Sequence, residues 1–60
     1  MCLATVYNTG DNSVLFRNVS RLDVDGKKII LRDIMGDEKV FEGSIVMVDL
    51  ANSIVKLNLD

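Results

Sequence analysis

The stretch Asp23–Lys28, DVDGKK, is the strongest turn signal in the sequence, and apolar segments lie on both sides of it. Asp25 and Gly26 tolerate the positive φ angles of a type I′ turn, so we expect a tight β-hairpin with its turn at these two residues. The flanking segments, 14–24 and 28–34, are then adjacent antiparallel strands. DVDGKK is not a calcium loop, because the remaining ligands and the closing glutamate are missing.

Apolar residues continue to alternate with polar residues outside this hairpin, at a period of two, and clusters of turn-forming residues separate the alternating segments. Strands are expected at 2–7, 14–24, 28–34, 39–43, 45–50 and 54–59. About six short antiparallel strands without a helical stretch predict an all-β fold, for which a small SH3-like barrel is the natural size match. A chain of 60 residues is long enough for one such domain, spanning residues 1–60.

The alternation breaks within the second expected strand. Val14 and Phe16 lie on one face of that strand, whereas Val19 is out of phase with them. Val24 then returns to the first phase. We therefore expect a bulge or a bend near Arg17–Ser20, which is how small barrels turn a corner.

Two segments, Ile29–Leu31 and Ile45–Val48, have apolar side chains at successive positions. Successive residues of a strand point to opposite faces, so both faces of these strands are apolar. One interpretation is a strand that its own fold covers on both faces. The other is an outer face that is buried against a second copy of the chain. The core of so short a domain is marginal, which favours the second interpretation, a homodimer.

Several functional classes find little support in the composition. The chain has no histidine, the commonest general base, and its serines lack a nucleophile-elbow context, so we do not expect an enzyme. No apolar run approaches the roughly 20 residues that span a bilayer, and no signal peptide is recognisable, so no membrane association is expected. A single cysteine argues against a disulfide scaffold and for the reducing conditions of the cytoplasm.

Five basic residues in the middle third of the chain raise the question of nucleic-acid binding: Arg17, Arg21, Lys27, Lys28 and Arg32. Aspartates are interleaved with them, the net charge is −2, and the three aromatic residues are too scattered to form a stacking platform. Nucleic acid is therefore not an expected partner. A small RNA- or protein-binding β-barrel in which Cys2 is only structural is the alternative hypothesis, and a structural subunit of a larger complex is a third.

Cys2, the only cysteine, is adjacent to Met1. A free cysteine is often a buried core residue, which is one interpretation of this position. The other interpretation is a metal site, because the Cys2 thiolate, the Cys2 amide nitrogen and the Met1 amine can chelate one ion. Such a planar set of nitrogen and sulfur donors suits Ni(II) or Cu(II). If Met1 is removed, Cys2 supplies both amine and thiolate. One chain offers too few donors for a closed site, and two chains at a two-fold axis double them.

Three stretches, MCLATVY at 1–7, KIILRDIMGDEKVFEG at 28–43 and IVMVDLANSIVKLNL at 45–59, resemble the CooT family. These are small nickel-binding accessory proteins associated with carbon monoxide dehydrogenase maturation, and the similarity covers essentially the whole chain. The resemblance implies an SH3-like homodimer that binds one Ni(II) at the subunit interface, with Cys2 as the nickel-binding cysteine. It also implies a nickel enzyme or its maturation factors as partners. Family members are also labelled predicted RNA-binding proteins, a label that rests on fold and does not decide function.

Overall fold

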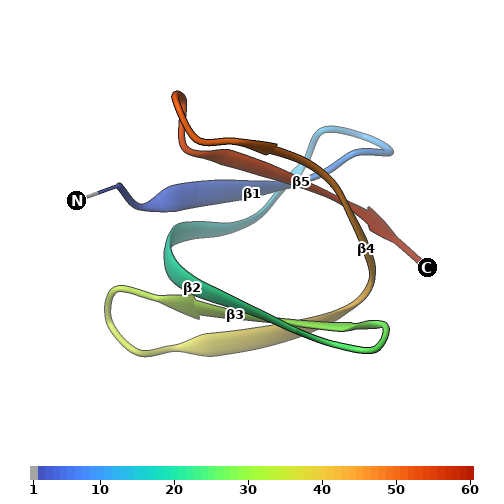
Figure 1. Ribbon diagram of the computed structural model, residues 1–60, viewed down its shortest axis with the longest axis horizontal. Helices are drawn as coiled ribbons and strands as arrows, with labels where there is room; N and C mark the ends of the chain where they lie inside the picture. Colours follow the sequence, from blue (N-terminus) through green and yellow to red (C-terminus); the bar gives the residue numbers. More distant parts are fainter. Residues whose placement is uncertain (1) are drawn as a thin grey trace.

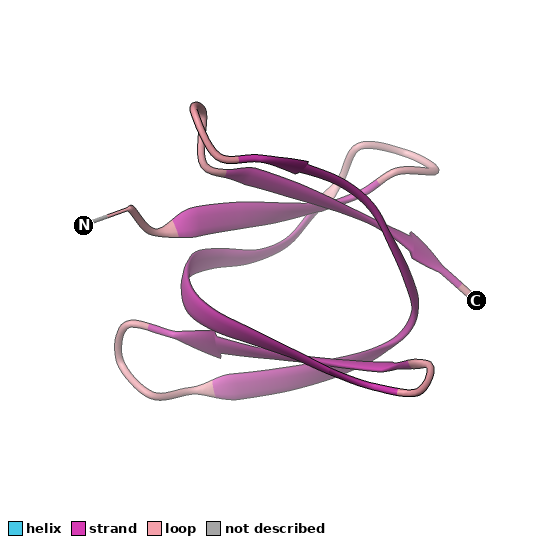
Figure 2. Ribbon diagram, in the orientation of Figure 1, coloured by secondary structure: helices cyan, strands magenta, loops and turns pink. Residues whose placement is uncertain are grey.

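The alternating segments form five strands, which the computed structural model shows closed into one barrel over the described residues, 2–60 (Figure 1). The strands are β1 (Ala4–Asn8), β2 (Val14–Asp25), β3 (Lys28–Asp33), β4 (Glu38–Asp49) and β5 (Ile54–Leu59). The described residues contain no helix (Figure 2). The prediction of a small all-β barrel is confirmed.

The strand count differs from the expected six, because the segments 39–43 and 45–50 belong to one strand, the 12-residue β4. This strand bends at Gly43, where the chain passes close to the backbone of β5. A Cβ atom at Gly43 would collide with the backbone oxygen of Asn58 and would lie 2.9 Å from the Cα of Leu59. The glycine therefore allows one strand to turn the corner without a loop.

The expected bend near Arg17–Ser20 is confirmed in β2. Asn18 has a φ of 56°, a left-handed conformation that asparagine adopts more readily than most residues. The pairing with β3 shifts register between Val19 and Arg21. Because of this bend, the first half of β2 pairs with β1 and the second half pairs with β3.

Sequential strands pair antiparallel, as expected, but β1 and β5 close the barrel as a parallel pair. In this closing pair Thr5 lies opposite Ile54 and Val6 lies opposite Val55. The direction follows from the strand count. When five strands alternate in direction, the first and the fifth run the same way.

The DVDGKK hairpin is present, but its turn lies one residue later than expected. Asp25 pairs with Lys28, so the two-residue loop is Gly26–Lys27. Gly26 has a φ of 60° and Lys27 is not among the residues with positive φ, which fits a type II′ turn rather than type I′. In this register Val24 lies opposite the buried Ile29 and Leu22 lies opposite the buried Leu31.

The bends in β2 and β4 divide the barrel into two layers (Figure 1). The upper layer contains β1, β5, the first half of β2 and the second half of β4, and the lower layer contains β3 and the other halves. The core between the layers consists of Val6, Val19, Ile29, Leu31, Val55 and Leu57. The N-terminus, the β3–β4 loop and the β4–β5 turn share one end of the barrel.

Candidate metal-binding end

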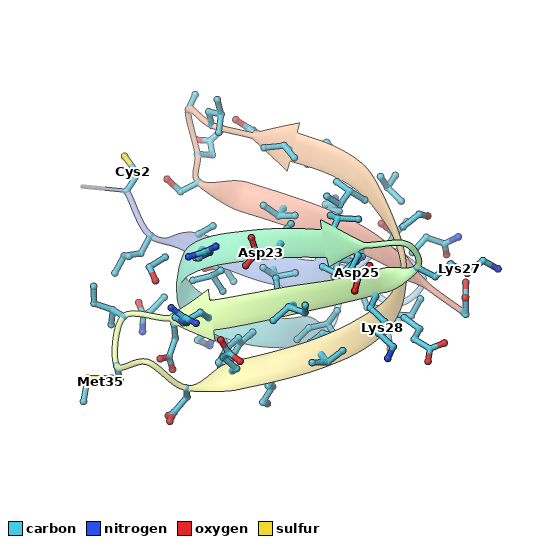
Figure 3. All side chains as sticks on the ribbon, turned by 60° about the horizontal axis from the view of Figure 1, so that its bottom comes forward. Cys2, Asp23, Asp25, Lys27, Lys28 and Met35 are labelled. Atoms are coloured by element: carbon cyan, nitrogen blue, oxygen red, sulfur yellow. The ribbon has the colours of Figure 1, made fainter. Side chains whose placement is uncertain are left out.

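Cys2 is exposed and its thiol is free. It lies two residues before β1, at one end of the barrel, and Figure 3 shows its side chain pointing away from the strands. In the described chain it therefore does not pack into the core, contrary to the interpretation of Cys2 as a core residue. Met1, the other residue expected at the site, lies outside the described residues.

The strand that carries Cys2 is paired on both sides. β1 lies between β2 and β5, with Ala4 opposite Val19. At the start of β1, the Thr5 N–H donates a hydrogen bond of 3.0 Å to the Ser53 carbonyl in the β4–β5 turn. The chain is thus anchored three residues after the thiol, which keeps Cys2 at this end of the barrel.

A carboxylate at the start of the β4–β5 turn, that of Asp49, stabilises the turn itself. The Asn52 N–H and the Asn52 side-chain amide donate to the two oxygens of Asp49, at 3.1 and 2.9 Å. The hydrogen bond from the Asn52 side chain, followed by that from its backbone, lowers the pKa of Asp49 below its ordinary value. Both Asp49 oxygens therefore hold the turn together.

Residues 2–60 of one chain contain no group of three or more His, Cys, Asp or Glu side chains that could hold a metal ion. The other exposed sulfur at this end is the thioether of Met35 in the β3–β4 loop, which Figure 3 places well apart from Cys2. A single chain thus supplies one thiol and its neighbouring backbone nitrogens. That donor set fits a soft or borderline metal only if the set is completed by a second chain or another molecule.

Carboxylates lie beside three of the five basic residues that the sequence singled out. Arg21 forms an ion pair with Asp23, at 2.9 Å, and Arg32 forms one with Glu38, at 2.6 Å. Lys28 lies in a cross-strand row between two further carboxylates, those of Asp25 and Glu42. Figure 3 shows Asp23 and Asp25 on the same surface. The arrangement lacks the continuous positive charge that binds a phosphate backbone, and it does not favour the nucleic-acid alternative.

Residues 2–60 contain no helix with the length and apolar character that a membrane crossing requires.

The sequence matches the model of the CooT family, described as CO dehydrogenase accessory protein CooT, over residues 1–58. No curated protein matches the chain at the significance threshold. Among solved structures, a crystal structure assigned to CooT of Carboxydothermus hydrogenoformans is similar, with a TM-score of 0.89 and 23% sequence identity. The alignment covers 98% of each chain. At this identity the structural similarity establishes the fold, while the sequence match carries the family.

Proposed function

Because the chain belongs to the CooT family of CO dehydrogenase accessory proteins, we propose that it is a Ni(II)-binding protein that carries or stores nickel for a metalloenzyme. In this proposal one Ni(II) is bound between the two subunits of a homodimer, through Cys2 and N-terminal nitrogens. The observation that carries the proposal is the exposed, free thiol at the end of a barrel that matches the family.

The proposed donors of each chain are the Cys2 thiolate, the deprotonated Cys2 amide nitrogen and the Met1 amine. Thiolate and nitrogen donors in one plane are a preferred arrangement of Ni(II), whereas Mg(II) and Ca(II) prefer oxygen donors. Copper binds such donors more tightly than nickel in the general affinity order, so nickel loading would depend on geometry and on which metal is supplied.

A site shared between two chains fits a cargo better than a permanent cofactor. The Cys2 thiol is exposed in the single chain, so acceptor ligands could reach the ion without unfolding the barrel. The proposed recipients are a nickel enzyme or its maturation factors. A reduced thiol requires reducing conditions, and we propose the cytoplasm as the compartment.

The direct test is a nickel titration of the wild-type chain and Cys2→Ser, followed by thiolate-to-metal charge-transfer absorbance and by native mass spectrometry. The wild-type chain should develop the absorbance and bind one Ni(II) per two chains. Cys2→Ser should lose the absorbance and bind nickel at least ~100-fold more weakly, because a hydroxyl is a much poorer ligand than a thiolate.

Met35→Leu is the matched control, because it removes an exposed sulfur from the same end of the barrel without touching Cys2. It should bind nickel like the wild-type chain. Equal nickel affinity of Cys2→Ser and the wild-type chain would refute the proposal.

A further inference from the structure

Along a line on one side of the barrel, no backbone pairing of residues 2–60 joins the two layers. The two segments that meet there are the second half of β2 and the second half of β4. The second half of β2 pairs with β3 on one side only, and the second half of β4 pairs only with β5. Both halves lie on the near side of Figure 1, one in each layer. No described strand pairing joins them, so side chains alone can close this side of the barrel.

Three side chains on this line point toward the barrel interior but remain partly exposed: Val24, Ile45 and Val48, which together we call the open seam. Their cross-strand partners, Ile29, Leu57 and Val55, are buried, and residues directly opposite in an antiparallel pair share a face. Their exposed fractions are nonetheless 56% for Val24, 39% for Ile45 and 51% for Val48. Part of the interior surface of the barrel is therefore open to solvent in a single chain.

The shape of the open seam indicates what kind of molecule covers it. Small-molecule sites are concave, and no pocket is present among residues 2–60. The second half of β4 also lacks the lysine or proline that usually protects an exposed sheet edge. An apolar strip of this kind is typical of a protein–protein contact.

We propose that a second copy of this chain covers the open seam, in a two-fold symmetric contact. The inference rests on the proposed homodimer and identifies its surface. One chain has a single thiol and no other cluster of metal-binding side chains, so the nickel site is incomplete without the copy. The open seam is the strip of inward-facing apolar residues that the single chain leaves uncovered.

The strip also leads toward the metal-binding end. Asp49, the last residue of β4, pairs with Ile54 of β5, and Ile54 pairs with Thr5 of β1. Thr5 is three residues from Cys2, and the next apolar residue after β4, Leu50, is 82% exposed at the same end. A contact along the open seam therefore extends toward the end of the barrel where the two Cys2 thiols must meet.

Val48→Glu tests this interface, with Val40→Glu as the matched control. Val40 is as exposed as Val24, but it lies on the outer face of the lower layer, opposite Ile30. Sedimentation velocity and native mass spectrometry over a range of protein concentrations report the oligomeric state, and circular dichroism reports the fold. The wild-type chain and Val40→Glu should be dimers. Val48→Glu should keep its β-sheet spectrum and weaken the dimer by ~100-fold or more. The reason is that the two-fold contact would bury one charged carboxylate from each chain.

Val48→Thr provides a second variant of nearly unchanged shape, in case the glutamate disturbs the fold. It should weaken the dimer by roughly tenfold. Cys2→Ser without nickel should remain a dimer, so loss of nickel binding and loss of the interface are separate results. A monomeric wild-type chain, a dimer unaffected by Val48→Glu, or a seam that binds only a different protein would overturn the inference.

Discussion

The two layers of the barrel also meet along a second line. Side chains of the same chain cover this line, whereas the residues of the open seam remain exposed. At this second line the first half of β2 faces the first half of β4, and three side chains lie along the line, which we call the closed seam: Phe16, Lys39 and Phe41. Both phenylalanines pack against the core. The Lys39 ammonium lies 5.1 Å from the centroid of the Phe16 ring and so links β4 to β2.

The difference between the seams is one of side-chain reach. Lys39 is exposed, but it lies opposite the buried Leu31, so its side chain starts on the inward face of β4. Its long aliphatic stem can therefore cover an aromatic ring. The open seam carries only valine and isoleucine, whose shorter side chains remain 39–56% exposed. Large aromatic side chains seal one side of this barrel within the chain, and we infer that the other side is sealed between chains.

The largest effect is expected from a substitution that prevents the bend of β4 at Gly43, because both seams depend on this bend. Gly43→Ala should destabilise the fold by about 3 kcal/mol, because the new methyl group meets the backbone of Asn58 and Leu59. Chemical denaturation monitored by circular dichroism measures this loss. The control is Gly10→Ala, whose added methyl would lie 3.6 Å from the nearest atom, an ordinary contact. It should change stability by less than about 0.5 kcal/mol, and equal losses would contradict the role of Gly43.

Truncating one residue in each seam tests whether only one seam is sealed within the chain. Phe41→Ala should cost about 2–3 kcal/mol at any protein concentration, because the ring packs against the core of its own chain. Val24→Ala should cost less than about 1 kcal/mol in dilute protein, since more than half of Val24 is exposed there.

The same two variants, Phe41→Ala and Val24→Ala, also test whether the open seam is buried in a dimer. If a second copy covers the open seam, the cost of Val24→Ala should grow with protein concentration, and that of Phe41→Ala should not. Denaturation curves at low and high concentration make the measurement. A cost of Val24→Ala that is independent of concentration would speak against burial of Val24 in a dimer.

Replacing the cation of the closed seam should have a smaller effect. Lys39→Met keeps a long flexible side chain over Phe16 but removes the charge, and it should cost about 0.5–1 kcal/mol. Lys28→Met, on the exposed outer surface, should change stability by less than about 0.5 kcal/mol. Thermal melts of both variants give the comparison, and equal changes would mean that the Lys39–Phe16 contact is not stabilising.

The smallest expected effect is a pH dependence at the turn where the open seam ends. Hydrogen bonds from Asn52 hold the pKa of Asp49 below its ordinary value of 3.8. The ionised carboxylate therefore stabilises the folded chain fully above pH 3.8, and this stabilisation is lost as the pH falls through the lower folded pKa. Wild-type protein should be more stable than Asp49→Asn at pH 7, and the difference should shrink on acidification.

Asp37→Asn is the control for that measurement, because the Asp37 side chain accepts no hydrogen bond from residues 2–60. At pH 7 it should lose less stability than Asp49→Asn, because it removes no such hydrogen bond. A difference between the wild-type chain and Asp49→Asn that stays constant with pH would contradict the role of the Asn52 hydrogen bonds.

Much of the fold could be predicted from local sequence. The period of two, the turn clusters and the phase change around Asn18 are encoded within a few residues of where they act. Most strand segments and the bend in β2 were therefore predicted, whereas the long strand β4 was divided into two. The turn at Gly26–Lys27 was missed by one residue. Two neighbouring turns suit DVDGKK, and both leave the buried Ile29 opposite an apolar residue on the same face of β2, so the hydrophobic pattern does not choose between them.

The candidate site could be predicted only in part. The sequence singles out Cys2 because it is the only thiol, and the structure adds that this thiol is exposed at an end of the barrel. The sequence also shows that Ile45–Val48 is apolar on both faces, but it does not single out Val24. Val24 alternates like a core residue and is exposed only because no strand lies beside it.

The sequence by itself determined where most strand segments form, where β2 bends and where the single thiol lies, because each depends on residue types at short range. Only the tertiary structure decided that β4 is one strand, that β1 and β5 pair in parallel, and that one seam is sealed while the other is open. Those features depend on how far side chains reach between strands that are distant in sequence, and a one-dimensional pattern does not contain that distance.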